Sequence, residues 1–211
     1  MIEPIFVLKI AACLAAGYII GCFSPSYLLG KLKSGKDIRE HGSGNAGATN
    51  TIRTFGMKWG VVVFCLDLLK GVCAFLLGRL LGGGYAFGIL CGVAAVLGHD
   101  FPIFLGFRGG KGISTSLGIL LGIHPVLGMC VVLSGIILSA ITRKISVISL
   151  CGLIVSPILL AVFDTGNLYG LIALVFLSAL GVFTHRANIL RLIKGEEKQL
   201  TISSNKTSDD L

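Results

Sequence analysis

The stretch GSGNAGATN, residues 42–50, carries only small or hydrogen-bonding side chains, although strongly apolar segments lie on both sides of it. Its glycines, Gly42 and Gly44 among them, allow tight turns and close approach of the backbone to a ligand. Arg53 follows with a guanidinium fork suited to phosphate. The stretch favours an anion site; a flexible loop or a run of helix caps is the alternative, because this is no Walker pattern. Its polar donors are Ser43, Asn45, Thr49 and Asn50.

A second stretch, FRGGKGISTS, places Lys111 among glycines directly before an apolar segment. Backbone amides in such a nest, together with the N-terminus of a following helix, attract phosphate. His99 lies near the end of the preceding apolar segment, where ionisable residues are functional candidates; a capping or core histidine is the alternative. The neighbours of Lys111 that we include in this candidate site are Gly109, Gly110, Gly112 and Thr115.

A third stretch, THRANILRLIKGEE, covers residues 184–197. His185, Asn188 and Arg191 recur at helical spacing and therefore share one side of a helix. A basic cap that anchors the last apolar segment at the membrane surface is the alternative.

The elements that must position these stretches are membrane helices. Of the 211 residues, 54% are hydrophobic and 13% charged, and the mean hydropathy is +0.91. Long apolar runs of this kind predict an all-α integral membrane protein. The net charge of +8 is explained by cytoplasmic loops that collect Lys and Arg, so nucleic acid is not expected as a partner. The expected spans are 4–30, 59–82, 85–105, 146–163 and 167–185, and a longer run at 113–142.

The run at 113–142 is too long for one untilted crossing. Most Lys and Arg fall in four clusters, and the positive-inside rule puts all four in the cytoplasm only if this run crosses twice. We therefore expect a break at Gly122-Ile123-His124-Pro125, with a half-span helix at 113–123. The prediction is a seven-crossing helical bundle with its N-terminus outside and its C-terminus cytoplasmic. Residues 1–198 would form one domain, and 199–211 a polar, disordered tail.

Two pairs inside the apolar segments have a structural interpretation. Asp67 and Lys70, at i and i+3, are expected to form an ion pair, with a proton relay as the alternative. Gly17 and Gly21 form a small-xxx-small pair typical of helix packing. No Cys or His spacing fits a metal site, and no carboxylate cluster fits Mg²⁺, so neither metal nor cofactor is expected.

Together the three stretches resemble the bacterial acyl-phosphate:glycerol-3-phosphate acyltransferases, the PlsY family. That family carries GSGN-x-GATN-x-x-R, then GH-x-x-P followed by F-[KR]-GGKG, then H-R-x-N-I-x-R-L with G-x-E after it. This chain has GSGNAGATNTIR, GHDFPIFLGFRGGKG and HRANILRLIKGEE in the same order. The resemblance covers the chain apart from its polar tail. Ser114 stands where alanine is more usual, and Cys22-Phe23-Ser24-Pro25 replaces Ser-Ile-Pro.

The resemblance implies a multi-pass enzyme of the bacterial plasma membrane whose active site faces the cytoplasm. It would transfer a fatty acyl chain from acyl phosphate to the sn-1 hydroxyl of glycerol 3-phosphate, releasing inorganic phosphate. Formation of the product, lysophosphatidic acid, would be the first step of phospholipid synthesis. Acyl-carrier protein and acyl-CoA would not be direct donors, and a monomer is expected to be active.

Site residues follow from matching positions. The implied catalytic residues are Ser43, Arg53, Lys111, His185 and Asn188. The implied substrate-binding residues are Gly42, Gly44, Asn45, Thr49, Asn50, His99, Gly109, Gly110, Gly112, Thr115, Ser146 and Arg191. The implied structural residues are Glu197, Asp67 and Lys70.

Acyl phosphate is an activated mixed anhydride, so the protein needs to align the substrates, stabilise an oxyanion and remove one proton. His185, His99 or a substrate phosphate oxygen, with a second pKa of about 6, are the open choices for the base. The HxxxxD dyad of the other class of glycerol-phosphate acyltransferases is absent, because none of the four histidines has Asp at the required position. A small transporter of organic phosphate, or a scaffold subunit, is the alternative function.

Overall fold

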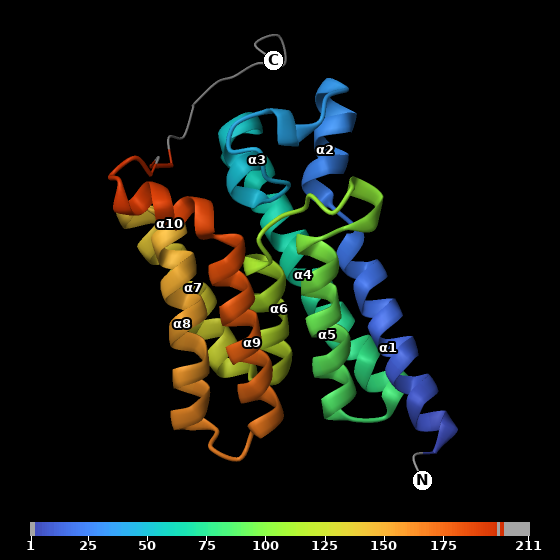
Figure 1. Ribbon diagram of the computed structural model, residues 1–211. Helices are drawn as coiled ribbons and strands as arrows, with labels where there is room; N and C mark the ends of the chain where they lie inside the picture. Colours follow the sequence, from blue (N-terminus) through green and yellow to red (C-terminus); the bar gives the residue numbers. More distant parts are fainter. Residues whose placement is uncertain (1–2, 198, 201–211) are drawn as a thin grey trace.

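Helices are the only regular elements in the part of the chain that the computed structural model describes, residues 3–197 and 199–200. Figure 1 shows long helices side by side, with shorter helices and loops gathered at one end. The long helices are α1 (Pro4–Cys22), α4 (Met57–Gly82), α5 (Tyr85–Asp100), α7 (Pro125–Thr142), α8 (Ile145–Phe163) and α9 (Leu168–Thr184). The short helices are α2 (Pro25–Ser34), η1 (Ile38–Glu40), α3 (Ala48–Phe55), η2 (Ile103–Leu105), α6 (Ile113–Ile123) and α10 (Arg186–Ile193).

Several of these helices are long and apolar enough to cross a membrane. Leu168–Thr184 and Arg186–Ile193 make one more candidate if they count as a single span bent by 61°, and Ile113–Ile123 is apolar but short. The predicted all-helical architecture is confirmed, and helices cover each predicted span, two of them in the case of 4–30, whereas the count of seven crossings stays a prediction. The five clear candidates are Pro4–Ser34, Met57–Gly82, Tyr85–Leu105, Pro125–Thr142 and Ile145–Phe163.

The break predicted inside the 113–142 run is confirmed. α6 ends at Ile123 and α7 begins at Pro125, because proline fits the first turn, where its missing amide hydrogen costs nothing. The side chain of His124 caps α7 by accepting from the amide of Leu127 at 3.2 Å. α6 has 11 residues and is therefore about 16 Å long, roughly half of a hydrocarbon core.

Glycines bring the helix backbones into direct contact. A Cβ atom at Gly17 would lie 2.1 Å from the carbonyl oxygen of Cys91, so α1 packs closely on α5, as the small-residue spacing predicts. Between α4 and α6, a Cβ at Gly118 would lie 2.1 Å from the carbonyl oxygen of Leu68. α6 is therefore held tightly against α4, and this fixes the loop that precedes it.

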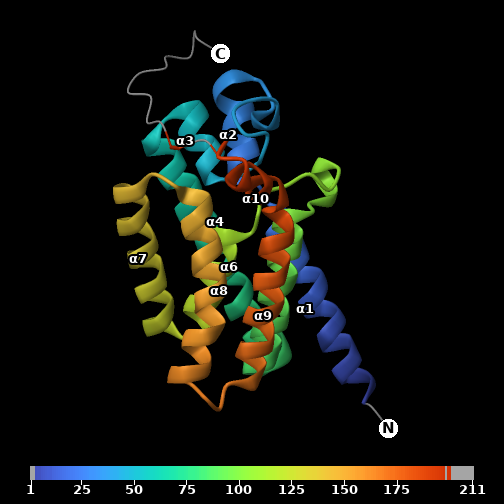
Figure 2. The same ribbon diagram turned by 60° about the vertical axis from the view of Figure 1, so that its left-hand side comes forward.

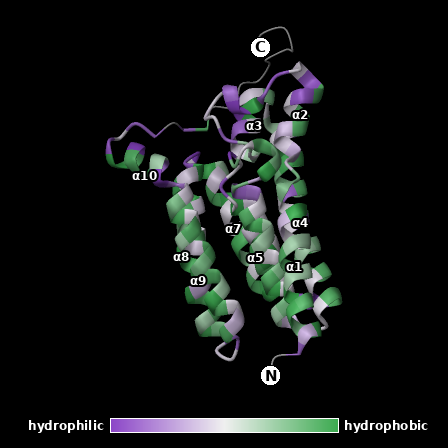
Figure 3. Ribbon diagram, turned by 45° about the vertical axis from the view of Figure 1, so that its right-hand side comes forward, coloured by the Kyte–Doolittle hydropathy of each residue, from purple (hydrophilic) through white to green (hydrophobic). Residues whose placement is uncertain are grey.

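The expected first span, 4–30, is divided into two helices. α1 ends at Cys22 and α2 starts at Pro25, with the Ser24 hydroxyl accepting from the amide of Tyr27 at 3.4 Å. The reason is that proline disfavours helical geometry in the residue before it. Figure 3 shows hydrophilic residues concentrated at the end of the bundle that carries α2, α3 and α10.

Near the end of the chain, Leu200 is buried, and its amide donates to the carbonyl oxygen of Arg143 at 2.9 Å. This contact holds the last described residues against the α7–α8 turn. The rest of the predicted polar tail, 201–211, lies outside the described residues, so the domain boundary near residue 198 stays a prediction.

Candidate active site

Asn50 organises the first polar loop. Its buried Oδ1 accepts from the backbone amide of Ser43 at 2.6 Å and from the Ser43 hydroxyl at 3.1 Å. Its Nδ2 donates to the carbonyl oxygens of Ile38 and His41, each at 3.0 Å. Gly42 has a φ of 62°, and a Cβ there would lie 2.2 Å from Asn50 Oδ1, so only glycine fits. The asparagine thus fixes the loop that presents Ser43.

The second polar loop folds back onto the end of α5. The amides of Gly109 and Gly110 donate to the carbonyl oxygens of Asp100 at 3.1 Å and His99 at 3.0 Å. A Cβ at Gly110 would lie 2.0 Å from Nε2 of His99, and a Cβ at Gly109 would lie 2.0 Å from its carbonyl oxygen. The glycines are therefore required for this close approach, which places Lys111 immediately before α6.

The first two loops also bond to each other. The amide of Ala46 donates to the carbonyl oxygen of Gly109 at 3.3 Å. Gly112, with a φ of 71°, precedes the first turn of α6 and has no side chain to cap it. The partial positive charge of that helix end therefore lies close to Lys111, as the glycine nest in the sequence predicts.

A hydrogen-bonded chain joins Lys111 to the third polar segment. The Lys111 ammonium donates to Oδ1 of Asn188, whose Nδ2 donates to Oγ of Ser146 at 2.8 Å and to Oε1 of Glu197 at 2.7 Å. The Ser146 hydroxyl also donates to Glu197, at 2.5 Å, and Nε of Arg191 donates to its Oε2 at 2.8 Å. Glu197 is the shared acceptor that holds these side chains together.

The three polar segments line one end of a cavity of about 950 Å³. All five expected catalytic residues are on its wall, as are most of those expected to bind substrate. Gly42, Gly44 and Gly109 shape the loops behind the wall, and Arg191 contacts Glu197. The expected structural residue Asp67 also lines the cavity. The expected catalytic and substrate-binding residues on the wall are Ser43, Asn45, Thr49, Asn50, Arg53, His99, Gly110, Lys111, Gly112, Ser146, His185 and Asn188.

The other walls of the cavity are largely apolar and come from α4, α6, α7, α8 and α9. Figure 2 shows α7 and α8 standing beside the other long helices, with α10 above them. Ile145 and Leu159 both line the cavity and lie fourteen residues apart on α8, a rise of about 21 Å. Apolar residues along this length include Phe64, Leu120, Val131 and Leu174. The cavity thus suits a ligand with a charged head and a long apolar tail.

Positive charge dominates around Lys111. The pKa of Lys111 is lowered to about 8, chiefly by burial; Glu197 acts to raise it, and Arg191 and Arg53 act with burial to lower it. Burial also lowers the pKa of Arg53, whose guanidinium nevertheless stays charged. For Glu197, burial acts to raise the pKa, but hydrogen bonds from its three partners outweigh it and keep the pKa below the usual value. Three cations around one carboxylate form a site for an anion.

The two candidate histidines differ in tautomer. Nδ1 of His185 lies 2.8 Å from the carbonyl oxygen of Gly181, which can only accept, so this nitrogen carries the hydrogen and Nε2 keeps its lone pair. Nδ1 of His99 lies 2.7 Å from the Lys70 ammonium, which can only donate, and 3.4 Å from Oδ1 of Asp67, which can only accept. The shorter contact makes Nδ1 an acceptor and leaves the hydrogen on Nε2. His185 is therefore arranged as a proton acceptor at Nε2 and His99 as a hydrogen-bond donor.

The predicted ion pair in α4 is present, with Nζ of Lys70 lying 2.8 Å from Oδ1 of Asp67. Both side chains are buried, and the ammonium also donates to the carbonyl oxygens of Gly21 at 3.1 Å and Phe23 at 2.8 Å. The pair thus ties α4 to the end of α1. These contacts favour the structural interpretation over a proton relay, because a buried charge that leaves such partners is costly.

A model of the glycerol-3-phosphate acyltransferase family matches residues 11–195, which include the first two polar segments and the third as far as Gly195. The chain belongs to this family. A glycerol-3-phosphate acyltransferase of Thermoanaerobacter pseudethanolicus is 42% identical over 183 residues, covering 87% of this chain and 91% of the relative. One from Clostridioides difficile is 43% identical over 188 residues, with the same two coverages, 87% and 91%.

Solved structures of the family agree with the fold. The crystal structure of PlsY, an integral membrane glycerol 3-phosphate acyltransferase, in its glycerol 3-phosphate form has a TM-score of 0.83 and 34% identity. It covers 91% of this chain and 96% of its own. The lysophosphatidic acid form has a TM-score of 0.79 at 33% identity, covering 90% and 94%. The family resemblance drawn from the three sequence motifs is confirmed.

The structure also shows what the motifs missed. Ser114 and Ser116 line the cavity, whereas Thr115, expected to bind substrate, is fully buried beside α4 and outside the described wall. Helical spacing explains this, because residues 113, 117 and 120 share the cavity face and Thr115 does not. The apolar residues of the cavity walls could not be predicted from the sequence, since any membrane helix has such residues.

Proposed function

We propose that this protein transfers a fatty acyl chain from acyl phosphate to the sn-1 hydroxyl of glycerol 3-phosphate. The products are 1-acyl-glycerol 3-phosphate, which is lysophosphatidic acid, and inorganic phosphate. The observation that supports this proposal most strongly is a cavity that is cationic at one end and apolar along the rest. Acyl phosphate has the same division, and glycerol 3-phosphate needs only the polar end. The related PlsY structures, in glycerol 3-phosphate and lysophosphatidic acid forms, support this choice.

The phosphate groups bind among Arg53, Lys111 and the N-terminus of α6. Arg53 and Lys111 both line the cavity, Arg53 from α3 and Lys111 from the loop before α6, so they contact the anion from two directions. The Ser43 hydroxyl contributes a polar group on the same wall. Charged hydrogen bonds in a partly dehydrated site are the strong ones, which is why a cluster of this kind holds a dianion.

The reaction is a direct acyl transfer. The glycerol hydroxyl oxygen attacks the carbonyl carbon, and the oxyanion that forms is stabilised by the cationic groups. The bond from that carbon to the phosphate oxygen then breaks, and phosphate leaves with the bonding electrons. Because the donor is already activated, alignment and charge stabilisation suffice and no acyl-enzyme is formed.

The hydroxyl proton goes to a base. His185 fits this role, because its Nε2 lone pair is free of the Gly181 bond and its side chain lines the cavity. A phosphate oxygen of the bound substrate is the competing base, since its second pKa is about 6. His99 is a donor at Nε2, so we assign it to binding rather than to proton removal.

The polar end of the bundle faces the cytoplasm in this proposal. The bond from Leu200 to Arg143 supports it, because it puts the α7–α8 turn and the end of the described chain on one side. Figure 1 shows the N-terminus at the opposite end. With α6 and α7 counted as separate passes, the chain crosses a bacterial plasma membrane seven times. One chain carries all the expected catalytic residues, so we propose an active monomer.

The identity of the acyl donor is the most direct test of the proposed function. Purified protein in detergent is given glycerol 3-phosphate with palmitoyl phosphate, palmitoyl-CoA or palmitoyl-acyl-carrier protein, and lysophosphatidic acid is measured. We expect product only with palmitoyl phosphate. Product formed faster from the thioesters would contradict the donor assignment, and no product with any donor would favour the transporter alternative.

A further inference from the structure

Arg39 lies in η1, just before the first polar loop, and bonds to the turn that leads into the second polar loop; it is not among the residues assigned above to substrate. We propose that Arg39 is a positioning residue, whose guanidinium clamps the turn at residues 105–108 and so holds the Lys111 loop in its binding position. The inference rests on the proposed function, since it supposes that Lys111 binds a substrate phosphate.

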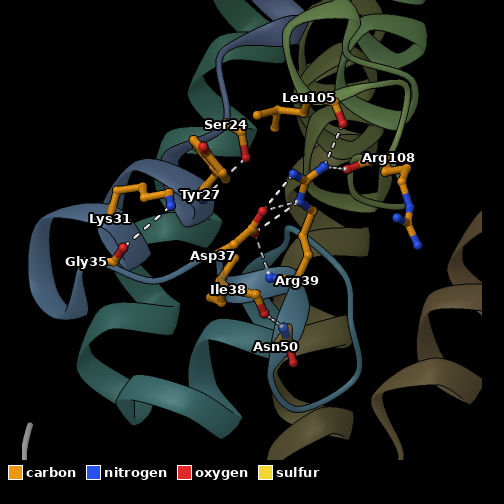
Figure 4. A network of polar contacts seen from close by, with 10 residues as sticks. All are labelled: Ser24, Tyr27, Lys31, Gly35, Asp37, Ile38, Arg39, Asn50, Leu105 and Arg108. Carbon is orange, nitrogen blue, oxygen red and sulfur yellow. Dashed lines mark hydrogen bonds and ion pairs between the residues drawn. The ribbon is translucent and has the colours of Figure 1, made fainter. Parts of the chain in front are cut away.

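The clamp has two sides (Figure 4). On one side, Nη1 of Arg39 donates to the carbonyl oxygens of Leu105 at 2.6 Å and Arg108 at 3.0 Å. On the other, Nε donates to both carboxylate oxygens of Asp37 at 3.0 Å, and Nη2 donates to Oδ2 at 2.7 Å. Only a planar guanidinium offers donors in both directions at once, so lysine is not an equivalent replacement.

Charge and packing fix the guanidinium further. The hydrogen bond from Arg39 lowers the pKa of Asp37 against the opposing effect of burial, so the carboxylate stays ionised. The Tyr27 ring lies 5.5 Å from the guanidinium carbon. The two side chains are only 20% and 16% exposed, which shields their bonds from water.

The clamped turn has a strained backbone. Gly106 and Phe107 have φ values of 63° and 61°, and phenylalanine rarely adopts a positive φ. The carbonyl groups that Arg39 holds belong to Leu105 and Arg108, the residues on either side of this pair. Phe107 is 58% exposed, so the packing of its side chain does not explain the conformation. The bond from its amide to the carbonyl oxygen of Pro102, at 2.9 Å, and the clamp on either side of it hold the turn in this form.

The turn leads directly to Lys111, three residues beyond Arg108. The groups that act electrostatically on the Lys111 ammonium are Glu197, Arg191 and Arg53, and the ammonium acts in turn on His185. Loss of the clamp lets the turn relax and Lys111 gain water. Phosphate binding weakens, and the pKa of Lys111, lowered first by burial to about 8, rises toward its usual value.

The test compares Arg39→Ala, Arg39→Lys and Asp37→Asn with wild type, and with Lys36→Ala as a nearby exposed control. We expect Arg39→Ala to raise KM for glycerol 3-phosphate about tenfold while kcat falls much less, as for loss of one charged hydrogen bond. The alkaline limb of kcat/KM moves to higher pH. Arg39→Lys recovers only part of the loss, and Lys36→Ala behaves as wild type.

A second variant separates positioning from folding. Phe107→Gly removes the free-energy cost of the positive φ. In the Arg39→Ala background it therefore brings KM and the pH of the alkaline limb part of the way back to their wild-type values. If Arg39→Ala does not fold, Asp37→Asn and Arg39→Lys provide the same two readouts. The inference would be overturned if folded variants kept the wild-type KM and the wild-type alkaline limb of kcat/KM. It would also be overturned if kcat fell while the alkaline limb stayed in place and Phe107→Gly gave no rescue. A wild-type protein that makes no lysophosphatidic acid would instead overturn the proposed function.

Discussion

Lys111 and Asn188 are hydrogen-bonded across the polar end of the cavity, although they lie 77 residues apart in the chain. Lys111 precedes α6, and Asn188 belongs to α10, so the bond joins the second and third polar segments. Through Asn188, the lysine is also linked to Glu197. The ammonium is thus held in a half-buried, hydrogen-bonded position by the protein itself, which is the preorganisation that catalysis requires.

The first prediction concerns pH. The pKa of Lys111 is lowered to about 8, chiefly by burial, so the ammonium loses its proton as pH rises through that value. A neutral amine binds phosphate poorly, and kcat/KM, which reports the free enzyme, should therefore fall on the alkaline side near pH 8. The arginine in Lys111→Arg stays charged, so the remaining activity of this variant should not show the fall of kcat/KM near pH 8. A limb that persists in Lys111→Arg would assign the titration to another group.

The second prediction concerns Arg53. Its removal deletes a charged hydrogen bond to phosphate, so Arg53→Ala should lower kcat/KM by about 10–100-fold. Arg53→Lys should recover part of this, because the ammonium keeps the charge without the bidentate fork. Lys58→Ala, a basic residue outside the cavity wall, is the control and should be nearly silent. An equal loss in that control would mean that general surface charge, not this site, attracts the substrates.

The third prediction separates the two possible bases. If His185 removes the proton, His185→Ala should lower kcat by at least about 100-fold, the usual contribution of a general base. His124→Asn is a matched control, because His124 only caps α7 and asparagine is a good N-cap. A loss in His185→Ala of no more than about threefold would transfer the role to a substrate phosphate oxygen.

The fourth prediction tests the topology. In a variant stripped of its seven cysteines, single cysteines are placed at Arg143 and Thr165, which lie in successive turns on either side of α8. An impermeant maleimide added to intact cells should label position 165 and miss position 143. Labelling at 143 would contradict the seven-crossing arrangement and the cytoplasmic site.

Sequence alone located much of this site because its side chains lie in three compact motifs. The break between α6 and α7 before Pro125 could also be predicted, since the distribution of Lys and Arg and the chemistry of proline both favour it. What sequence did not show were contacts between distant residues. The Ser146–Glu197 bond and the clamp from Arg39 to Leu105 join positions 51 and 66 residues apart. Sequence also did not show that Thr115 is buried while Ser114 and Ser116 line the cavity, because neighbours in sequence point to different sides of a helix. Substrate binding by Thr115 stays a prediction.

The central claim is that this single chain couples acyl transfer to phosphate release with no further component. The most direct measurement is the ratio of lysophosphatidic acid formed to phosphate released by purified protein, with palmitoyl phosphate and glycerol 3-phosphate, in the presence of EDTA. We expect equal amounts of the two products, with the acyl chain on the sn-1 oxygen. Phosphate release without lysophosphatidic acid, or activity that returns only when Mg²⁺ is added, would contradict the account.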